Sequence, residues 1–229
     1  MKIKQHLIWP LNIALMMGVL LGDIAYITLG GTLIKGLTSM LFVVLGLTNL
    51  IYLVWQKRTL RFPIILTVGL IFAMLGDILL NIHFITGAIF FAIGHVWFFV
   101  AYTMLIKFQW TDLIYGAAIF VPALLFILLM PVFDFGGVIM EIVCVAYAFV
   151  ISLMVGKAIA NSLTQLNLRN LLIVIGSLLF LFSDLMLLLN VFGNLSQVFS
   201  VLCLATYYPA ECLLALSIFA HRDQTTVQN

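Results

Sequence analysis

Residues 62–80 read FPIILTVGLIFAMLGDILL, an apolar run in which Asp77 is the only charged residue. An α-helix of about 20 apolar residues spans the hydrocarbon core of a bilayer and pairs its own backbone polar groups. The stretch therefore predicts a membrane-spanning helix with an acid inside it. Similar apolar runs recur along the rest of the chain.

The composition extends this prediction to the whole chain. Of 229 residues, 65% are hydrophobic and 8% are charged, and the mean hydropathy is +1.28. An ordinary soluble domain is about half apolar and about a quarter charged. Strand-like alternation is absent, which argues against a membrane β-barrel, and a net charge of +2 is too small to indicate nucleic-acid binding. We expect an all-α membrane protein in which residues 1–229 form a single polytopic membrane domain.

Eight apolar runs, separated by charged or turn residues, predict a bundle of eight transmembrane helices. They lie at residues 7–28, 33–55, 62–80, 84–106, 112–130, 136–158, 168–190 and 196–219. Nine of the ten basic residues fall on one side of this arrangement, and Lys35 alone falls on the other. By the positive-inside rule, both termini are predicted to be cytoplasmic.

Two of the predicted helices carry similar segments around an acid. FAMLGDILL at residues 72–80 can be aligned with LFLFSDLML at residues 179–187, which matches Asp77 with Asp184. The two helices run in the same direction, so the similarity predicts a four-plus-four parallel internal repeat. At a rise of 1.5 Å per residue, both acids are expected roughly 6 to 9 Å below the non-cytoplasmic interface.

Ionisable residues inside membrane helices are rare because charge is costly to bury in hydrocarbon, so each one is a candidate for function. Those of this chain are Asp23, Lys35, Asp77, His95, Glu141, Asp184 and Glu211. Asp77, Asp184, Lys35, Glu141 and Asp23 are all expected in the outer leaflet. We expect two or three of the carboxylates, the lysine and, as an open alternative, a histidine to converge in one cavity below the outer headgroups.

Simpler interpretations stay open for several of these residues. Lys35 can extend its ammonium to the headgroups, and a lone buried histidine such as His95 more often packs than binds a ligand. Asp23 and Glu141 can lie close to the headgroups, and Glu211 can be held by the neighbouring tyrosines.

Common signatures of soluble enzymes do not occur in the sequence. GxSxG, HExxH, the P-loop and a dinucleotide-binding GxGxxG motif are all missing. The four histidines are too dispersed to suggest a three-histidine zinc site, so we expect no metal.

Four short motifs follow one another in order over nearly the whole chain. They are Gly76-Asp77-Ile78-Leu79-Leu80, Gly94-His95 with Tyr102, Ser183-Asp184 with Asn190, and Tyr207-Tyr208-Pro209-Ala210-Glu211. In this order and spacing they resemble the YhhN-like lysoplasmalogenase family. Two positions depart from the family pattern: Gly36 follows Lys35 where the family usually has proline, and Glu211 stands where glutamine is more common. These departures bear on substrate preference.

The resemblance implies hydrolysis of the vinyl ether bond of a lysoplasmalogen to a fatty aldehyde and glycerophosphoethanolamine or glycerophosphocholine. Protonation of the β-carbon of a vinyl ether gives an oxocarbenium ion that water captures, and two carboxyl groups can serve as the acid and as the charge-balancing base. No cofactor is needed. The expected catalytic residues are Asp77 and Asp184, and the expected substrate-binding residues are Lys35, His95, Tyr102, Asn190, Tyr207, Tyr208 and Glu211. We expect a bacterial inner-membrane location, surrounded by membrane lipids.

Two other classes of function remain open from the sequence. Paired acids, a lysine and an internal repeat also suit a proton-coupled transporter of a small or lipid-like substrate, for which helices broken at mid-membrane are typical. A structural membrane protein would leave the acids unexplained. The oligomeric state is not indicated.

Overall fold

The protein is described by a computed structural model that covers residues 5–193 and 195–221, with side chains from Ile8 onward. The described residues form eight helices: α1 (Gln5–Leu29), α2 (Thr32–Trp55), α3 (Arg61–Leu80), α4 (Phe84–Leu105), α5 (Trp110–Leu129), α6 (Val138–Thr164), α7 (Leu168–Phe192) and α8 (Val198–Phe219). Each is long and apolar enough to cross a bilayer. The expectation of an all-α, multi-pass membrane protein is confirmed.

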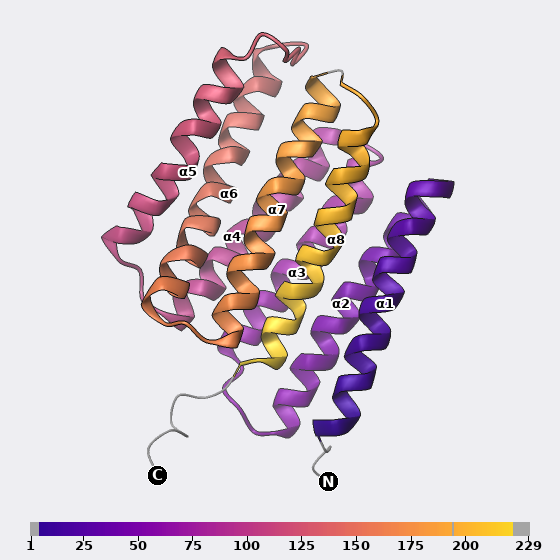
Figure 1. Cartoon of the computed structure of the whole chain (residues 1–229), viewed down its shortest axis with the longest axis vertical. Coiled ribbons are helices and arrows are strands. Elements are labelled where there is room, and N and C mark those ends of the chain that lie inside the picture. The colour runs from indigo at the N-terminus through magenta and orange to yellow at the C-terminus, as the bar shows by residue number, and fades with distance from the viewer. Residues whose placement is uncertain (1–4, 194, 222–229) are drawn as a thin grey trace.

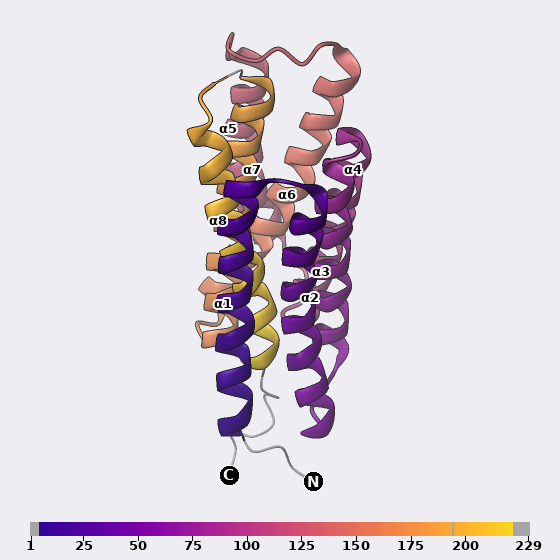
Figure 2. The ribbon, with the colours of Figure 1, turned by 90° about the vertical axis from the view of Figure 1, so that its right-hand side faces the viewer.

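The helices run side by side along the long axis of the molecule, and neighbours in sequence alternate in direction (Figure 1). The start of α1 and the end of α8 lie at the same end of the bundle, which we call the terminal end. The turn between α1 and α2 lies toward the opposite, distal end (Figure 2). Which end faces the cytoplasm stays a prediction, as does the internal repeat. Three basic residues behind that prediction, Lys2, Lys4 and Arg222, lie outside the described residues.

Helix α8 packs against α1, α2, α3 and α7, and three other helices, α2, α3 and α6, each pack against three neighbours. Helix α2 packs against α1, α3 and α8, whereas α6 packs against α4, α5 and α7. The peripheral helices differ, because α1 also packs against α8, while α5 contacts α6 alone among the described helices. Helix α5 therefore stands away from α4 and α7.

The helix bounds agree with the sequence prediction to within a few residues, except that α6 continues to Thr164 instead of ending at residue 158. The sequence prediction places Asn161 in the turn between the helices at residues 136–158 and 168–190. Asn161 is instead buried within the helix, where its Nδ2 donates to the Tyr102 carbonyl at 2.9 Å. The Asn161 carbonyl accepts from Asn170 Nδ2 at 3.3 Å. Cross-helix hydrogen bonds hold its Nδ2 and its backbone carbonyl, while its Oδ1 has no hydrogen-bond partner among the described residues.

Buried charge also holds together the terminal half of the bundle. Lys157 on α6 is fully buried, and its Nζ lies 2.8 Å from Asp112 Oδ2 on α5 and 3.2 Å from the Lys107 carbonyl. Because both charges are buried and paired, removing either partner would leave the other uncompensated. This ion pair is a structural link between α5 and α6, well separated in sequence from the acids of the distal half.

Candidate active site

A polar cavity of about 250 Å³ lies in the distal half of the bundle, between α1, α2, α3, α4, α7 and α8. Asp77 of α3 and Asp184 of α7 both line it. The other polar side chains in its wall are Tyr26, Lys35, Asn81, Ser183, Asn190, Ser200, Cys203 and Tyr207. The two acids that the sequence paired by similarity therefore share one cavity.

Asp77 is held by two residues of α2. Its Oδ1 lies 3.3 Å from Lys35 Nζ, and its Oδ2 accepts a hydrogen bond from Ser39 Oγ at 2.5 Å. Lys35 and Asp77 are 5% and 2% exposed, so they form a buried ion pair. A lysine that extended to the headgroups would instead keep its ammonium in water. Here the ammonium remains inside the bundle.

The same ammonium is shared with residues at the mouth of the cavity. Lys35 Nζ donates to Asn81 Oδ1 at 3.3 Å and lies 5.6 Å from the centre of the Tyr26 ring. Asn81 in turn donates from Nδ2 to the Tyr26 hydroxyl at 3.2 Å. These contacts connect α1, α2 and α3 around one positive charge, which is suited to bind an anionic group.

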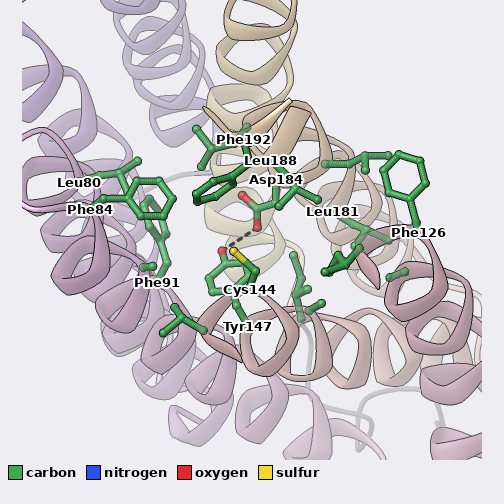
Figure 3. Close-up of a pocket in the computed structure, with 18 residues that line it drawn as sticks. Leu80, Phe84, Phe91, Phe126, Cys144, Tyr147, Leu181, Asp184, Leu188 and Phe192 are labelled. Atoms are coloured by element: carbon green, nitrogen blue, oxygen red, sulfur yellow. Dashed lines mark hydrogen bonds between the residues drawn. The ribbon is translucent and has the colours of Figure 1, made fainter. Parts of the chain in front are cut away.

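Asp184 has different partners. The Tyr147 hydroxyl of α6 donates to Asp184 Oδ2 at 2.7 Å, as the dashed line in Figure 3 shows. His95 Nε2 of α4 lies 2.8 Å from the same tyrosine hydroxyl and 3.5 Å from Asp184 Oδ2. The acid is thus held by a phenol and an imidazole, whereas Asp77 is held by a cation and a serine.

A second, apolar pocket of about 120 Å³ lies on the other side of Asp184, where α5 stands away from α4 and α7. Its wall is formed by α3 to α7 and is made almost entirely of hydrocarbon and aromatic side chains, with the Asp184 carboxylate, the Tyr147 hydroxyl and the Cys144 thiol among them (Figure 3). Asp184 lines both spaces. A polar compartment and an apolar compartment therefore meet at one carboxyl group.

The remaining candidate residues from the sequence fall into two groups. Asn190 and Tyr207 line the polar cavity. Tyr208 lies one step behind its wall, with its hydroxyl 3.4 Å from Ser39 Oγ. Tyr102 and Glu211 belong to neither wall.

Both of these outlying residues are fully buried. The Tyr102 hydroxyl is 3.0 Å from Ser177 Oγ, and neither Glu211 oxygen has a hydrogen-bond partner among the described residues. Asp23 is buried in α1 and Glu141 lies in the first turn of α6, and neither lines the two spaces.

Several residues of the site were not identified from the sequence. Tyr147 is the most important, because it is the direct partner of Asp184. Its signal was that of a phenol in the middle of the predicted helix at residues 136–158. Tyr26 and Asn81 lay near predicted helix ends, where polar residues are ordinary. Ser39 follows Lys35 by four residues, on the same face of α2.

No group of three His, Cys, Asp or Glu side chains in residues 5–193 and 195–221 is arranged to hold a metal ion. The chemistry that the site offers is that of two carboxyl groups, a lysine and two hydroxyl donors. Such a set can transfer protons and can stabilise either sign of charge.

Comparison with known protein families gives one match: residues 32–218 match the model of the YhhN family. Neither the curated proteins nor the solved structures yielded a match. The matched range covers α2 to α8 almost completely and includes both acids, whereas α1 with Tyr26 lies before it. The chain therefore belongs to the YhhN family, which is the lysoplasmalogenase family.

Proposed function

We propose that this protein hydrolyses the vinyl ether bond of lysoplasmalogens. The observation that carries the proposal is that Asp77 and Asp184 line one polar cavity while Asp184 also lines an apolar pocket. Membership of the YhhN family supports the same class of reaction.

The two compartments suit a lipid with one chain. A lysoplasmalogen has a phosphate headgroup on glycerol and a single alkenyl chain, and the vinyl ether joins these two parts. In the proposed complex, the Lys35 ammonium binds the phosphate as a point charge. The chain lies in the apolar pocket beside α5, where burial from water is favourable. The vinyl ether then lies next to Asp184.

The chemistry requires one water and no other reactant. A carboxylic acid gives its proton to the β-carbon of the vinyl ether, which leaves an oxocarbenium ion. A carboxylate takes a proton from water as the water oxygen bonds to the carbon next to the ether oxygen. The resulting hemiacetal loses its hydroxyl proton, and the glycerol oxygen gains a proton. The bond between the hemiacetal carbon and the glycerol oxygen breaks, which releases the fatty aldehyde. Glycosidases use comparable carboxyl pairs for an oxocarbenium-like transition state.

The transporter alternative receives no support from the helices that carry the acids. Transporter sites are typically built from helices broken near mid-membrane. Among the described residues, α3 and α7 each run as one continuous helix from Arg61 to Leu80 and from Leu168 to Phe192.

The test is a substrate panel with purified protein in lipid nanodiscs, read by mass spectrometry. The lysoplasmalogen should give a fatty aldehyde and the glycerophospho headgroup. The saturated ether analogue should give no product, because it has no double bond to protonate, and the acyl lysophospholipid should give no fatty acid. Failure of the folded protein to release aldehyde from any headgroup or chain length would refute the proposal, as would cleavage of the ester alone.

A further inference from the structure

The neighbours of the two acids point to a division of labour between them. We infer that Asp184 is the general acid that protonates the alkenyl carbon, and that Tyr147, oriented by His95, is a positioning residue that aims its carboxyl group. Asp77 remains the carboxylate that balances charge and accepts the proton from water. This inference rests on the proposed function and assigns a role to Tyr147, which the sequence did not identify.

The two acids differ in their position relative to the alkenyl chain of the substrate. The carbon that receives the proton is the β-carbon, which is the double-bonded carbon that is not attached to the ether oxygen, so it lies on the alkenyl-chain side of the ether. Asp184 lines the apolar pocket, and Asp77 does not. A general acid has to be within hydrogen-bond reach of the atom that it protonates. Asp184 meets this requirement for a chain bound beside α5.

Charge distinguishes them as well. Asp77 lies 3.3 Å from the buried ammonium of Lys35. Protonating Asp77 before substrate binds would leave that ammonium without its counter-charge inside the bundle, which is costly. In the proposed complex the substrate phosphate supplies that counter-charge, so Asp77 can then accept the proton from water. The described partners of Asp184 are Tyr147 and His95, a phenol and an imidazole, and neither is a lysine or an arginine. Asp184 can therefore carry a proton without breaking an ion pair.

Tyr147 fixes the orientation of the Asp184 carboxyl group. Its hydroxyl occupies Oδ2 at 2.7 Å, so the proton for catalysis is assigned to Oδ1. Correct alignment of a reacting group matters greatly, because a misplacement of about 1 Å can cost a factor of about 100 in rate. Losing the hydroxyl would leave the carboxyl group free to rotate away from the chain.

His95 in turn fixes the direction of the tyrosine hydroxyl. The imidazole is fully buried, with Phe180 at 4.6 Å and Tyr147 at 5.4 Å between ring centres. Its Nδ1 has no hydrogen-bond partner among the described residues, whereas its Nε2 reaches Tyr147 at 2.8 Å. An imidazole that donates from Nε2 to the phenol oxygen directs the phenol hydrogen toward Asp184. A histidine that served packing alone would not need this contact.

The first test separates positioning from binding. Tyr147→Phe should lower kcat by roughly 10- to 100-fold with KM changed less than about twofold, because the hydroxyl acts on the acid and not on substrate affinity. Tyr52→Phe is the matched control: it removes a hydroxyl from another buried tyrosine, whose ring packs on Phe219 at 5.5 Å far from the cavity. Its kcat should stay at the wild-type value. An unchanged kcat in Tyr147→Phe, or an effect on KM alone, would overturn the inference.

The second test asks whether His95 acts through Tyr147. His95→Leu should lower kcat by the same order as Tyr147→Phe, whereas His95→Gln, whose amide can still donate to the phenol, should recover part of the loss. In the double variant Tyr147→Phe/His95→Leu the two effects should not multiply, because residues that act through one contact are strongly coupled. If the two losses in kcat multiply, His95 does not act through Tyr147 and is a packing residue.

Infrared spectroscopy tests the assignment of the proton itself. In difference spectra against the wild type, which cancel the contribution of other carboxyl groups such as the buried Glu211, the carbonyl stretch of one protonated carboxyl group should be lost in Asp184→Asn, remain in Asp77→Asn and shift in Tyr147→Phe. The reverse pattern would assign the acid to Asp77 and overturn the inference. Failure of the proposed function is a separate result: in that case the wild type and Tyr52→Phe would release no aldehyde, whatever the spectra show.

Discussion

Asp77 and Asp184 stand in similar segments of sequence, yet their surroundings differ in every partner. On one side, α2 supplies Lys35 and Ser39 to Asp77. On the other side, α6 supplies Tyr147 to Asp184, and His95 of α4 lies behind it. In both cases a hydroxyl from the neighbouring helix binds the acid, but only Asp77 has a cation. Two acids in similar sequence segments therefore have different partners, because a different helix packs against each.

The peripheral helices differ in a matching way. Helix α1 packs against both α2 and α8, and its Tyr26 lines the polar cavity. Helix α5 packs against α6 alone among the described helices, and the space between it and α7 is the apolar pocket. The first region is built to hold charge and the second to hold hydrocarbon. The comparison predicts that mutations around the polar cavity change KM and stability, whereas mutations in the apolar pocket change the preference for chain length.

Loss of either acid should produce the largest effect. Asp77→Asn and Asp184→Asn should each lower aldehyde release by at least about 100-fold, because general acid–base catalysis typically contributes factors of roughly 10² to 10⁴. They should differ in stability. Asp77→Asn leaves the Lys35 ammonium buried without its partner and should lower the thermal unfolding temperature, whereas Asp184→Asn should change it little.

The double variant Asp77→Asn/Lys35→Met sharpens this distinction. It removes both charges together, so it should regain stability without regaining activity. Thermal unfolding of detergent-solubilised protein and product release measure the two properties independently. Equal stability of the two single Asn variants would contradict the distinction between Asp77, which forms an ion pair with a lysine, and Asp184, which does not.

Lys35 should show the next largest effect. Lys35→Ala should raise KM by roughly ten- to a hundredfold, and more than it lowers kcat, because a hydrogen bond to a charged group contributes about 1.5–3 kcal/mol. Lys35→Arg keeps the charge and is the matched control, with a smaller rise in KM expected. If KM stays normal in Lys35→Ala, the ammonium serves Asp77 and not the phosphate.

The pocket beside α5 should show the smallest and most selective effect. Ala148 lines this pocket, whereas Ala146 on the same helix is exposed on the lipid-facing side. Ala148→Leu should lower kcat/KM several-fold for long alkenyl chains and less for short ones, because the added side chain occupies pocket volume. Ala146→Leu should leave the chain-length profile unchanged. Equal profiles for both variants would show that the chain binds elsewhere.

Most of the fold was predictable because it depends on local properties of the sequence. Hydropathy alone identified eight helices, and their bounds agree closely with the structure. The exception at α6 arose because asparagine usually marks a turn, although the Nδ2 of Asn161 donates to the Tyr102 carbonyl across the helix interface. A local pattern cannot reveal a partner that lies far away in sequence.

The same limit applies to the site. Asp77, Asp184 and Lys35 were recognisable because charge inside a membrane helix is conspicuous. Tyr147 carries no charge and gave only a weak signal, since its role depends on how α6 is rotated toward α7. The apolar pocket was also not predictable, because it arises from the absence of packing between α5 and α7 in the described residues.

The reaction in deuterated water is the most direct test of the central claim. If a carboxylic acid protonates the alkenyl carbon, the fatty aldehyde from the wild type should carry one deuterium on the carbon next to its carbonyl. Ready-made aldehyde incubated with the protein under the same conditions controls for exchange after release. Asp184→Asn should form less than about 1% of the labelled product. Release of unlabelled aldehyde, or labelled aldehyde formed at the normal rate by Asp184→Asn, would contradict hydrolysis by acid catalysis at this site.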